Sequence, residues 1–150
     1  MSTRSFIGIV QEDGTVKGVY CHSDGYPSNQ MPLLTENYTV AKKVDELVSL
    51  GDMSQLDRRI CPPKNSKHSF DHRRKGVCVY YGRDRGEDSN AIKPTVIERK
   101  KLASFIKRGW YQYAYLFKDG KWKAYEVTYP DKGGKRFRKM TERELKAAIA

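Results

Sequence analysis

Two Asp-Gly dipeptides lie between β-rich runs, and they constrain the fold of this chain more than any other feature. Asp13-Gly14 separates residues 5–11 from residues 15–22, and Asp119-Gly120 separates residues 111–118 from residues 121–129. Asp-Gly favours the tight turns whose twist matches that of paired antiparallel strands. We therefore expect one β-hairpin at the start of the chain and another near its end.

An amphipathic helix is predicted over residues 39–50. Its apolar residues recur at the spacing of one helical face, and Gly51 follows as a stop signal. These apolar residues are Val40, Val44, Leu47 and Val48. The polar, proline-containing stretch from 52 to 75 predicts a long irregular connection, and the apolar run within residues 75–82 predicts a further strand.

The spacing Thr-x-x-Glu occurs at residues 95–98 and again at residues 141–144. In a capping box of this kind the threonine hydroxyl and the glutamate carboxylate satisfy the free amides of a helix's first turn. The two matches predict helices over about residues 96–108 and 142–149.

Together these elements predict the α+β fold class. We expect a single domain over residues 1–150, with a mostly antiparallel sheet of about five strands and about three helices. The residues from about 131 to 150 are expected to form a basic C-terminal extension with a short helix.

The expected cellular location follows from features that the sequence lacks. It has no apolar run near the roughly 20 residues that span a membrane, and its N-terminus has no secretory core. Three cysteines, Cys21, Cys61 and Cys78, form no CxxC pair, so reduced thiols are expected. We therefore expect a cytoplasmic protein with no membrane partner.

The charge of the chain is uneven. Residues 1–57 hold four Lys and Arg against eight Asp and Glu, whereas residues 58–150 carry the other 25 basic side chains against 10 acidic ones. A positive field of this kind attracts polyanions and phosphate-bearing ligands. The alternative is that these are solvating surface charges.

A first group of chemically capable side chains follows the first predicted hairpin, in Cys21-His22-Ser23-Asp24-Gly25-Tyr26-Pro27. In an extended strand His22 and Asp24 point the same way, and a carboxylate beside an imidazole fixes its tautomer and raises its basicity. The pair is therefore a candidate for catalysis as a general base, with His68 of the long connection as a second imidazole and Tyr26 as a ligand contact. The alternative is a plain turn, with His68 solvated.

A second group, at residues 81–87, follows the run within residues 75–82 and supplies Tyr81, Arg83, Asp84 and Arg85. Two guanidinium groups at this spacing match the geometry of a diphosphate or a cyclic nucleotide, which makes these four residues candidate ligand contacts. The alternative is a surface ion-pair network that contributes little to stability.

Other chemistries find little support. The Cys and His residues lack the short paired spacings of structural zinc, and the phosphate, protease and dinucleotide fingerprints are missing. No metal or cofactor is therefore expected. The aromatic run that starts at Trp110, with Trp122, Tyr125 and Tyr129 after it, suits base stacking if it is exposed, although packing against helices is the favoured interpretation.

Several segments resemble a family of small bacteriophage and prophage proteins over about residues 1–130. They are Met1-Ser-Thr-Arg-Ser-Phe-Ile-Gly, Asp13-Gly14, Tyr20-Cys21-His22-Ser23-Asp24-Gly25-Tyr26-Pro27, His68-Ser69-Phe70-Asp71, Tyr81-Gly82-Arg83-Asp84-Arg85-Gly86-Glu87, and Tyr115-Leu116-Phe117-Lys118-Asp119-Gly120-Lys121-Trp122. The chain departs from the family at Ser23, where relatives often carry Trp. The resemblance implies a phage-encoded protein in the host bacterial cytoplasm, and it carries no activity with it.

Three hypotheses of function follow. The leading one is a host-takeover or counter-defence protein that binds a signalling nucleotide or a nucleic acid between the His22 and Arg83 groups. The second is a metal-independent enzyme that cleaves such a ligand by acid–base chemistry of His22 and His68. The third is an inhibitor that docks on an acidic host defence protein. The sequence leaves the oligomeric state open.

Overall fold

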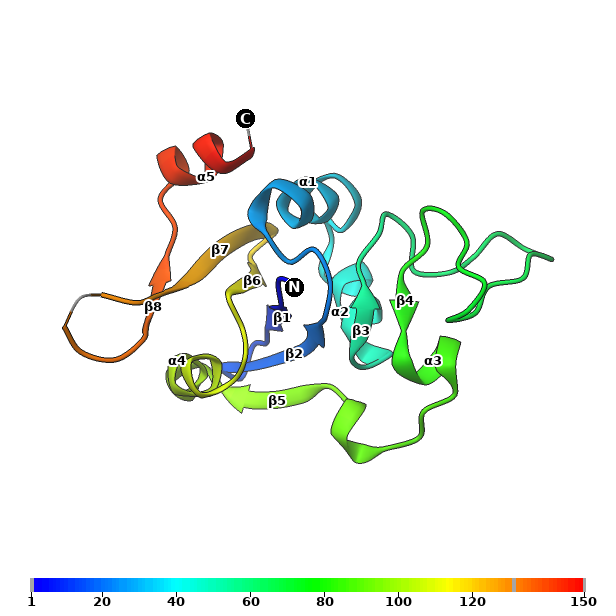
Figure 1. The fold of residues 1–150 in the computed structure, drawn as a ribbon, viewed down its shortest axis with the longest axis horizontal. Helices are drawn as coiled ribbons and strands as arrows, with labels where there is room; N and C mark the ends of the chain where they lie inside the picture. Colours follow the sequence, from blue (N-terminus) through cyan, green and yellow to red (C-terminus); the bar gives the residue numbers. More distant parts are fainter. Residues whose placement is uncertain (1, 131, 150) are drawn as a thin grey trace.

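The two predicted hairpins form the centre of the protein, shown in Figure 1 as a computed structural model that describes residues 2–130 and 132–149. The first hairpin comprises β1 (Ser5–Val10) and β2 (Thr15–Cys21), and the second comprises β6 (Tyr113–Lys118) and β7 (Lys121–Thr128). Each is antiparallel, and the turns place Gly14 and Gly120 at positive φ. A parallel pairing of β1 with β6 joins the hairpins, so the sheet is mixed.

Shorter strands extend this centre on both sides into an eight-stranded sheet. They are β3 (Met53–Gln55), β4 (Val79–Tyr80), β5 (Thr95–Glu98) and β8 (Arg136–Lys139). The order is β4-β3-β2-β1-β6-β7-β8, and β5 pairs with β2 outside this path. Most neighbouring strands are antiparallel, and β1–β6 and β2–β3 are parallel.

Helices lie on both faces of the sheet (Figure 1). They are α1 (Pro27–Asn37), α2 (Ala41–Ser49), α3 (Tyr81–Arg85), α4 (Arg99–Arg108) and α5 (Glu142–Ile149), with a short 3-10 turn, η1 (Asn90–Ile92). Side chains of a strand alternate between the faces. Ile7 and Ile9 of β1 accordingly belong to the core beneath α1 and α2, whereas Phe6 belongs to a second core beneath α4.

The predicted α+β class is confirmed, as are both hairpins and the helix at α2. The capping box at residues 141–144 is also formed, because the Thr141 and Glu144 side chains each accept the other residue's backbone N–H, at 3.1 and 3.0 Å. The predicted numbers of strands and helices were too low. Elements α1, α3, β3, β5 and β8 were not predicted, and β8 lies within the predicted basic extension.

The capping box predicted at residues 95–98 is wrong. These residues form β5, and α4 begins only at Arg99. The reason lies in the sheet, because β3 pairs with β2 only at Cys21 and leaves the first half of β2 open along that edge. Residues 95–98 occupy this edge, opposite residues 15–18.

The strand predicted within residues 75–82 is shorter than expected. Strand β4 ends at Tyr80, and Tyr81 begins α3. No helix among the described residues has the length and apolar character needed to cross a membrane.

Candidate functional site

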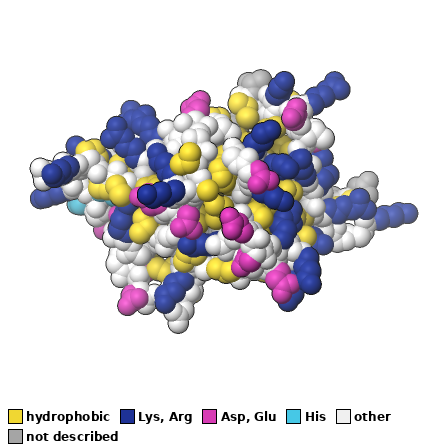
Figure 2. Space-filling view, turned by 180° about the vertical axis from the view of Figure 1, so that it is seen from behind, with side chains coloured by type: hydrophobic (Ala, Val, Ile, Leu, Met, Phe, Trp, Pro, Cys, Tyr) yellow, Lys and Arg dark blue, Asp and Glu magenta, His cyan; other side chains and the backbone are white. Residues whose placement is uncertain are grey.

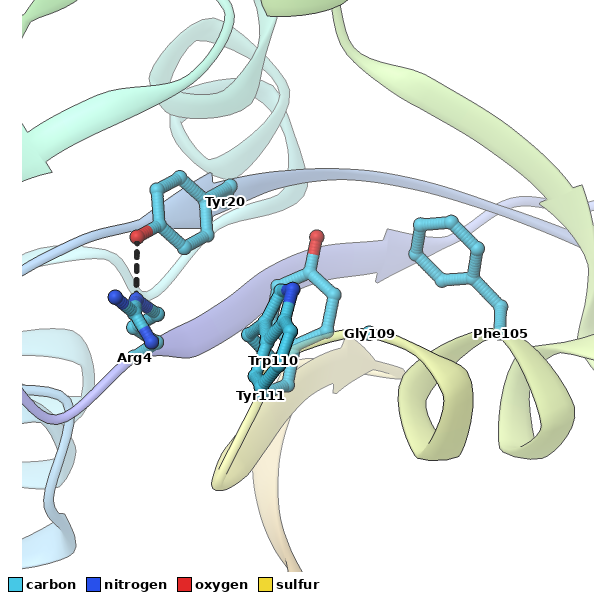
Figure 3. A pocket seen from close by; sticks show the side chains of 6 residues that line it. All are labelled: Arg4, Tyr20, Phe105, Gly109, Trp110 and Tyr111. Atoms are coloured by element: carbon cyan, nitrogen blue, oxygen red, sulfur yellow. Dashed lines mark hydrogen bonds between the residues drawn. The ribbon is translucent and has the colours of Figure 1, made fainter.

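A cavity of about 400 Å³ lies on the α4 face of the sheet, where α4 and β2 end. It is lined by Arg4, Tyr20, Phe105, Gly109, Trp110 and Tyr111. In Figure 3 Arg4 and Tyr20 stand on one side and Phe105 on the other, with the Tyr111 ring between them. The volume falls within the range of small-molecule sites in proteins.

A second cavity of about 210 Å³ shares Arg4, Trp110 and Tyr111 with the first, and it also reaches Tyr129 and Lys135. The two cavities therefore adjoin along the same side chains. We call the combined surface the aromatic groove, defined by Arg4, Tyr20, Trp110, Tyr111, Tyr129 and Lys135.

Two large aromatic side chains of the aromatic groove are open to solvent. Trp110 is 80% exposed and Tyr129 is 69% exposed. The Lys135 ammonium lies 5.9 Å from the centre of the Tyr129 ring, which places a positive charge beside one of them. Exposed aromatic surface next to polar groups is typical of binding sites.

The local sequence explains why Trp110 points outward. Helix α4 ends at Gly109, whose N–H donates to the Phe105 carbonyl oxygen at 3.1 Å. A Cβ at Gly109 would lie 2.7 Å from the Tyr111 ring, so the close approach requires glycine. The Tyr111 ring packs edge-on against Phe6 at 5.8 Å. Trp110 is therefore left on the solvent side of the chain.

Arg4 supplies a positive charge where the two cavities of the aromatic groove adjoin. Its Nε donates to the Tyr20 hydroxyl at 3.0 Å, as Figure 3 shows. Its carbonyl oxygen accepts the Gln112 N–H at 2.9 Å, which fixes the backbone beside the start of β6. Within residues 2–130 and 132–149 Arg4 forms no ion pair. The guanidinium group is thus oriented without being neutralised.

Asp52 contacts the backbone of Tyr20, a residue of the aromatic groove. Its Oδ1 accepts the Tyr20 backbone N–H at 3.0 Å. Burial raises the pKa of Asp52 to about 6, because desolvation disfavours the charged carboxylate. Burial also raises the pKa of the Tyr111 phenol, with a smaller contribution from the Asp52 charge. The acidic neighbour of the aromatic groove therefore titrates close to neutral pH.

The first predicted group, at residues 21–27, adjoins the aromatic groove. Its His22 contacts Tyr20 of the groove, whereas a contact with Asp24 was expected. Nδ1 of His22 lies 2.6 Å from the Tyr20 hydroxyl. Because that hydroxyl accepts a hydrogen from Arg4, its own hydrogen can be donated to His22. Asp24 is exposed at the left-handed φ of 53°, and Tyr26 caps α1. The structure thus pairs His22 with Tyr20.

The second predicted group is joined mainly to the protein interior. The Arg83 guanidinium donates Nε to Oδ1 of Asp84 at 2.9 Å and Nη2 to Oδ2 at 3.1 Å. The same Asp84 carboxylate accepts the Tyr80 N–H at 2.8 Å, and Nη2 of Arg83 also donates to the Cys78 carbonyl oxygen. The Asp84 side chain is 3% exposed. Arg83 and Asp84 therefore tie α3 to β4 and to the loop before it.

His68 belongs to the same buried network. Its side chain is 1% exposed, and Nε2 lies 3.3 Å from Oδ2 of Asp84. Nδ1 accepts the Arg74 N–H at 2.9 Å, so in the neutral ring Nε2 carries the hydrogen and donates it to the Cys78 carbonyl oxygen at 3.0 Å. Both ring nitrogens of His68 are thus engaged within the protein.

Arg85 and Tyr81 lie at the outer side of this network. The guanidinium groups of Arg85 and Arg73 lie 4.9 and 4.6 Å from the centre of the Phe70 ring. The Tyr81 ring is 5.8 Å from the same ring. Arg85 and Arg73 are exposed, and a weak pair with Glu87 at 4.0 Å involves Arg85.

The two predicted groups lie on either side of the short strand β3. The N–H of His22 donates to the Met53 carbonyl oxygen, and the N–H of Tyr81 donates to the Asp52 carbonyl oxygen. The structure therefore brings the ends of β2 and β4, and with them the two groups, to the start of β3. It does not bring His68, Arg83 or Asp84 to the aromatic groove, because His68 and Arg83 both contact the buried Asp84 carboxylate.

Among the described residues no three His, Cys, Asp or Glu side chains are close enough to hold a metal ion. The thiols of Cys21, Cys61 and Cys78 are free, and Cys21 and Cys78 are buried. Burial raises the pKa of the Cys78 thiol to about 11, so it is protonated at neutral pH.

Comparison with protein-family models, with curated proteins and with solved structures gave no significant match to this chain.

The aromatic groove was only partly visible in the sequence. Tyr115, Phe117 and Trp122 of the aromatic run are buried, as the packing interpretation expects, whereas Trp110 and Tyr129 at its two ends are exposed. The signal that distinguishes them is position, since Trp110 directly follows the glycine that ends a helix. Arg4 gave no signal of its own.

Proposed function

We propose that the protein binds a phosphate-bearing ligand with a nucleobase, a signalling nucleotide or a nucleic acid, in the aromatic groove. The observation that carries this proposal is the exposed Trp110 ring in a cavity that the cations Arg4 and Lys135 also line. The bases stack on Trp110 and Tyr129, while Arg4 and Lys135 hold phosphate.

Three contributions favour binding of such a ligand. Stacking of a base on an aromatic side chain contributes about 1–3 kcal/mol. A guanidinium group that is already oriented loses less freedom when it meets a phosphate. The net positive charge of the chain, +11, adds attraction over a longer range.

The family resemblance gives this proposal its biological setting. A phage-encoded protein that captures a nucleotide messenger or a nucleic acid in the host bacterial cytoplasm acts in host takeover or counter-defence. The ligand identity proposed here depends on the aromatic groove alone, so it can be tested without that setting.

The alternative of an enzyme has weaker support. His68 is buried with both ring nitrogens engaged, which leaves it no free nitrogen for proton transfer. His22 contacts the aromatic groove only through Tyr20. Recovery of an unaltered ligand after incubation with the protein would exclude cleavage.

The experiment is isothermal titration calorimetry of the protein with cyclic and linear nucleotides and with short DNA and RNA strands. We expect at least one of these ligands to bind, and we expect Trp110→Ala to lower the affinity at least tenfold. Tyr26→Ala, which removes another exposed aromatic ring beside α1, is the matched control and should bind as the wild type does. Silence across the whole panel would refute the proposal.

A further inference from the structure

A separate cavity of about 190 Å³ lies where α4 begins, on the same face of the sheet as the aromatic groove. Its lining residues are Val10, Arg99, Leu116, Lys118, Lys123 and Tyr125. Val10 and Leu116 belong to the apolar core beneath α4, so three cationic side chains surround an apolar floor. We call this cavity the cationic cavity.

The register of the second hairpin explains how these lysines meet. Lys123 of β7 is opposite Leu116 of β6, and Lys118 is opposite Lys121. Residues that are paired, or two apart along a strand, point to the same face of a sheet. Lys118 and Lys123 therefore lie diagonally across the two strands, on the face that α4 covers.

Arg99 is oriented toward the same place by Tyr125. Its Nη2 donates to the Tyr125 hydroxyl at 3.4 Å, and the guanidinium group lies 5.6 Å from the centre of the ring. The nearest acidic residue along the chain, Glu98, pairs instead with Lys100 and Lys101.

Charge in the cationic cavity is uncompensated. In the described part of the chain Arg99, Lys118 and Lys123 form no ion pair. Figure 2 shows Lys and Arg side chains gathered on the half of the molecule that holds α4, β7 and β8, and again on the loop between β3 and β4. Three cations with no carboxylate partner favour an anion.

The cationic cavity and the aromatic groove lie at opposite ends of α4. Arg99 is the first residue of this helix, and Phe105 and Gly109 line the groove at its other end. Ten helical residues extend over about 15 Å. At a rise of about 3.4 Å per phosphate along the axis of a stacked strand, roughly four nucleotides cover this distance.

We infer that the ligand is a single strand of nucleic acid that crosses α4, with its bases in the aromatic groove and its phosphates bound by Arg99, Lys118 and Lys123 in the cationic cavity. This inference rests on the proposed function. It adds that a mononucleotide would occupy only part of the combined site formed by the aromatic groove and the cationic cavity. Contacts to phosphate and aromatic stacking, without hydrogen bonds to base edges, bind strands with little sequence preference.

The test is a length series of oligothymidylates, from two to ten nucleotides, with DNA and RNA strands measured in parallel by fluorescence anisotropy. For the wild type, affinity is expected to rise steeply up to about four to six nucleotides, because longer strands reach both ends of α4. The double variant Lys118→Ala/Lys123→Ala should bind the dinucleotide as the wild type does and the octanucleotide at least tenfold more weakly.

The dependence on salt provides a second readout. A slope of about −0.7 per phosphate contact is typical of single strands, so the double variant should lose about 1.4 from the slope of log affinity against log salt. Lys42→Ala removes the same type of charge from α2, on the opposite face of the sheet, and should leave both readouts unchanged. Both lysines of the double variant are exposed, so its thermal midpoint should match that of the wild type.

The outcomes separate this inference from the proposed function. If the dinucleotide binds and the octanucleotide binds no more tightly, or the double variant retains full affinity for it, the strand path across α4 is refuted and the aromatic groove stands. If no strand of any length binds the wild type, the strand path is refuted, and the proposed function is then decided by the cyclic and linear nucleotides of the calorimetry panel.

Discussion

Tyr20 and His22 are joined by a hydrogen bond of 2.6 Å between the phenol oxygen and Nδ1. The two residues lie two positions apart at the end of β2, where their side chains point to the same face. Since the same phenol oxygen holds Nε of Arg4, Tyr20 links the imidazole to the guanidinium of the aromatic groove. Tyr20 therefore takes the place that the sequence analysis gave to Asp24.

The first prediction concerns this hydroxyl. Tyr20→Phe removes the hydrogen bonds to Arg4 and His22 and keeps the ring, so Arg4 is no longer held in place. We expect dinucleotide affinity to fall about three- to tenfold and the free energy of unfolding to fall by about 1 kcal/mol. Calorimetry and urea denaturation measure the two effects. Tyr26→Phe is the control, and an equal loss of affinity in it would point to the loop at residues 21–27 as the site.

A second prediction follows from the buried carboxyl of Asp52. Its pKa rises from 3.8 to about 6 because of burial. A carboxyl with a raised pKa in the folded state stabilises the fold below about pH 4, and this contribution is lost as the pH rises through about 6. Asp52→Asn keeps an oxygen for the Tyr20 N–H and cannot ionise.

We therefore expect the variant to gain stability relative to the wild type between pH 4 and pH 7. The gain should be about 1 kcal/mol, since partial solvation reduces the effect of the shift. Urea denaturation at several pH values measures it, with Asp24→Asn as a control for net charge. Parallel curves for wild type and Asp52→Asn over this range would contradict the prediction.

The third prediction concerns the contribution of the Asp84 carboxylate in α3 to stability. Asp84→Ala leaves the Arg83 guanidinium and the Tyr80 N–H without their partner. Because Arg83 is partly exposed and keeps its hydrogen bonds to carbonyl oxygens, we expect a loss of about 2–3 kcal/mol, mainly from the buried Tyr80 N–H left without an acceptor. Arg85→Ala, one residue further along and exposed, should cost less than about 1 kcal/mol. Chemical denaturation measures both variants, and a small loss in Asp84→Ala would show that this network does not hold the loop.

The fourth prediction concerns Gly25. A Cβ at this position would lie 2.7 Å from the Thr3 carbonyl oxygen and 2.8 Å from Cβ of Ser5, and the Gly25 N–H donates to the same Thr3 oxygen. Gly25→Ala therefore displaces the segment that carries Arg4. We expect a loss of about 1–3 kcal/mol in the free energy of unfolding.

Gly134→Ala is the matched control, because nothing lies within 4 Å of the added methyl group. Its thermal midpoint should stay at the wild-type value. Equal midpoints for wild type and Gly25→Ala would mean that the loop at residues 21–27 does not press on residues 3–5.

Local sequence signals predicted the elements that depend on local geometry. The turns at Gly14 and Gly120 require positive φ, which Asp-Gly provides, and both hairpins formed. The capping box at Thr141 also formed, since its two hydrogen bonds lie within one helical turn.

Elements that depend on distant partners were missed. The same Thr-x-x-Glu spacing at residues 95–98 gave a strand, because the open edge of β2 supplies hydrogen bonds that no local pattern reveals. Helix α1 was not predicted because Pro27 and Pro32 are atypical of a helix. Pro27 is nevertheless tolerated, because it lies in the first turn, where its missing N–H needs no partner.

The candidate site shows the same contrast between local signals, which the sequence reveals, and contacts between distant segments, which it does not. Sequence patterns singled out His22 and Arg83 as candidate site residues, and both make polar contacts within the structure. They did not show that Arg83 faces a buried carboxylate or that His22 faces Tyr20, because both contacts arise from the packing of strands and loops. Arg4, Trp110 and Lys135 come from three distant segments, and only the fold brings them together.

The most direct test of base binding in the aromatic groove is the fluorescence of Trp110 during titration with an octanucleotide. Trp110 is exposed and Trp122 is buried, so a ligand that stacks in the groove changes the emission of Trp110 alone. We predict saturable quenching in the wild type and none in Trp110→Phe, which retains Trp122. Unchanged emission of the wild type at millimolar ligand, or equal quenching in both proteins, would contradict the account.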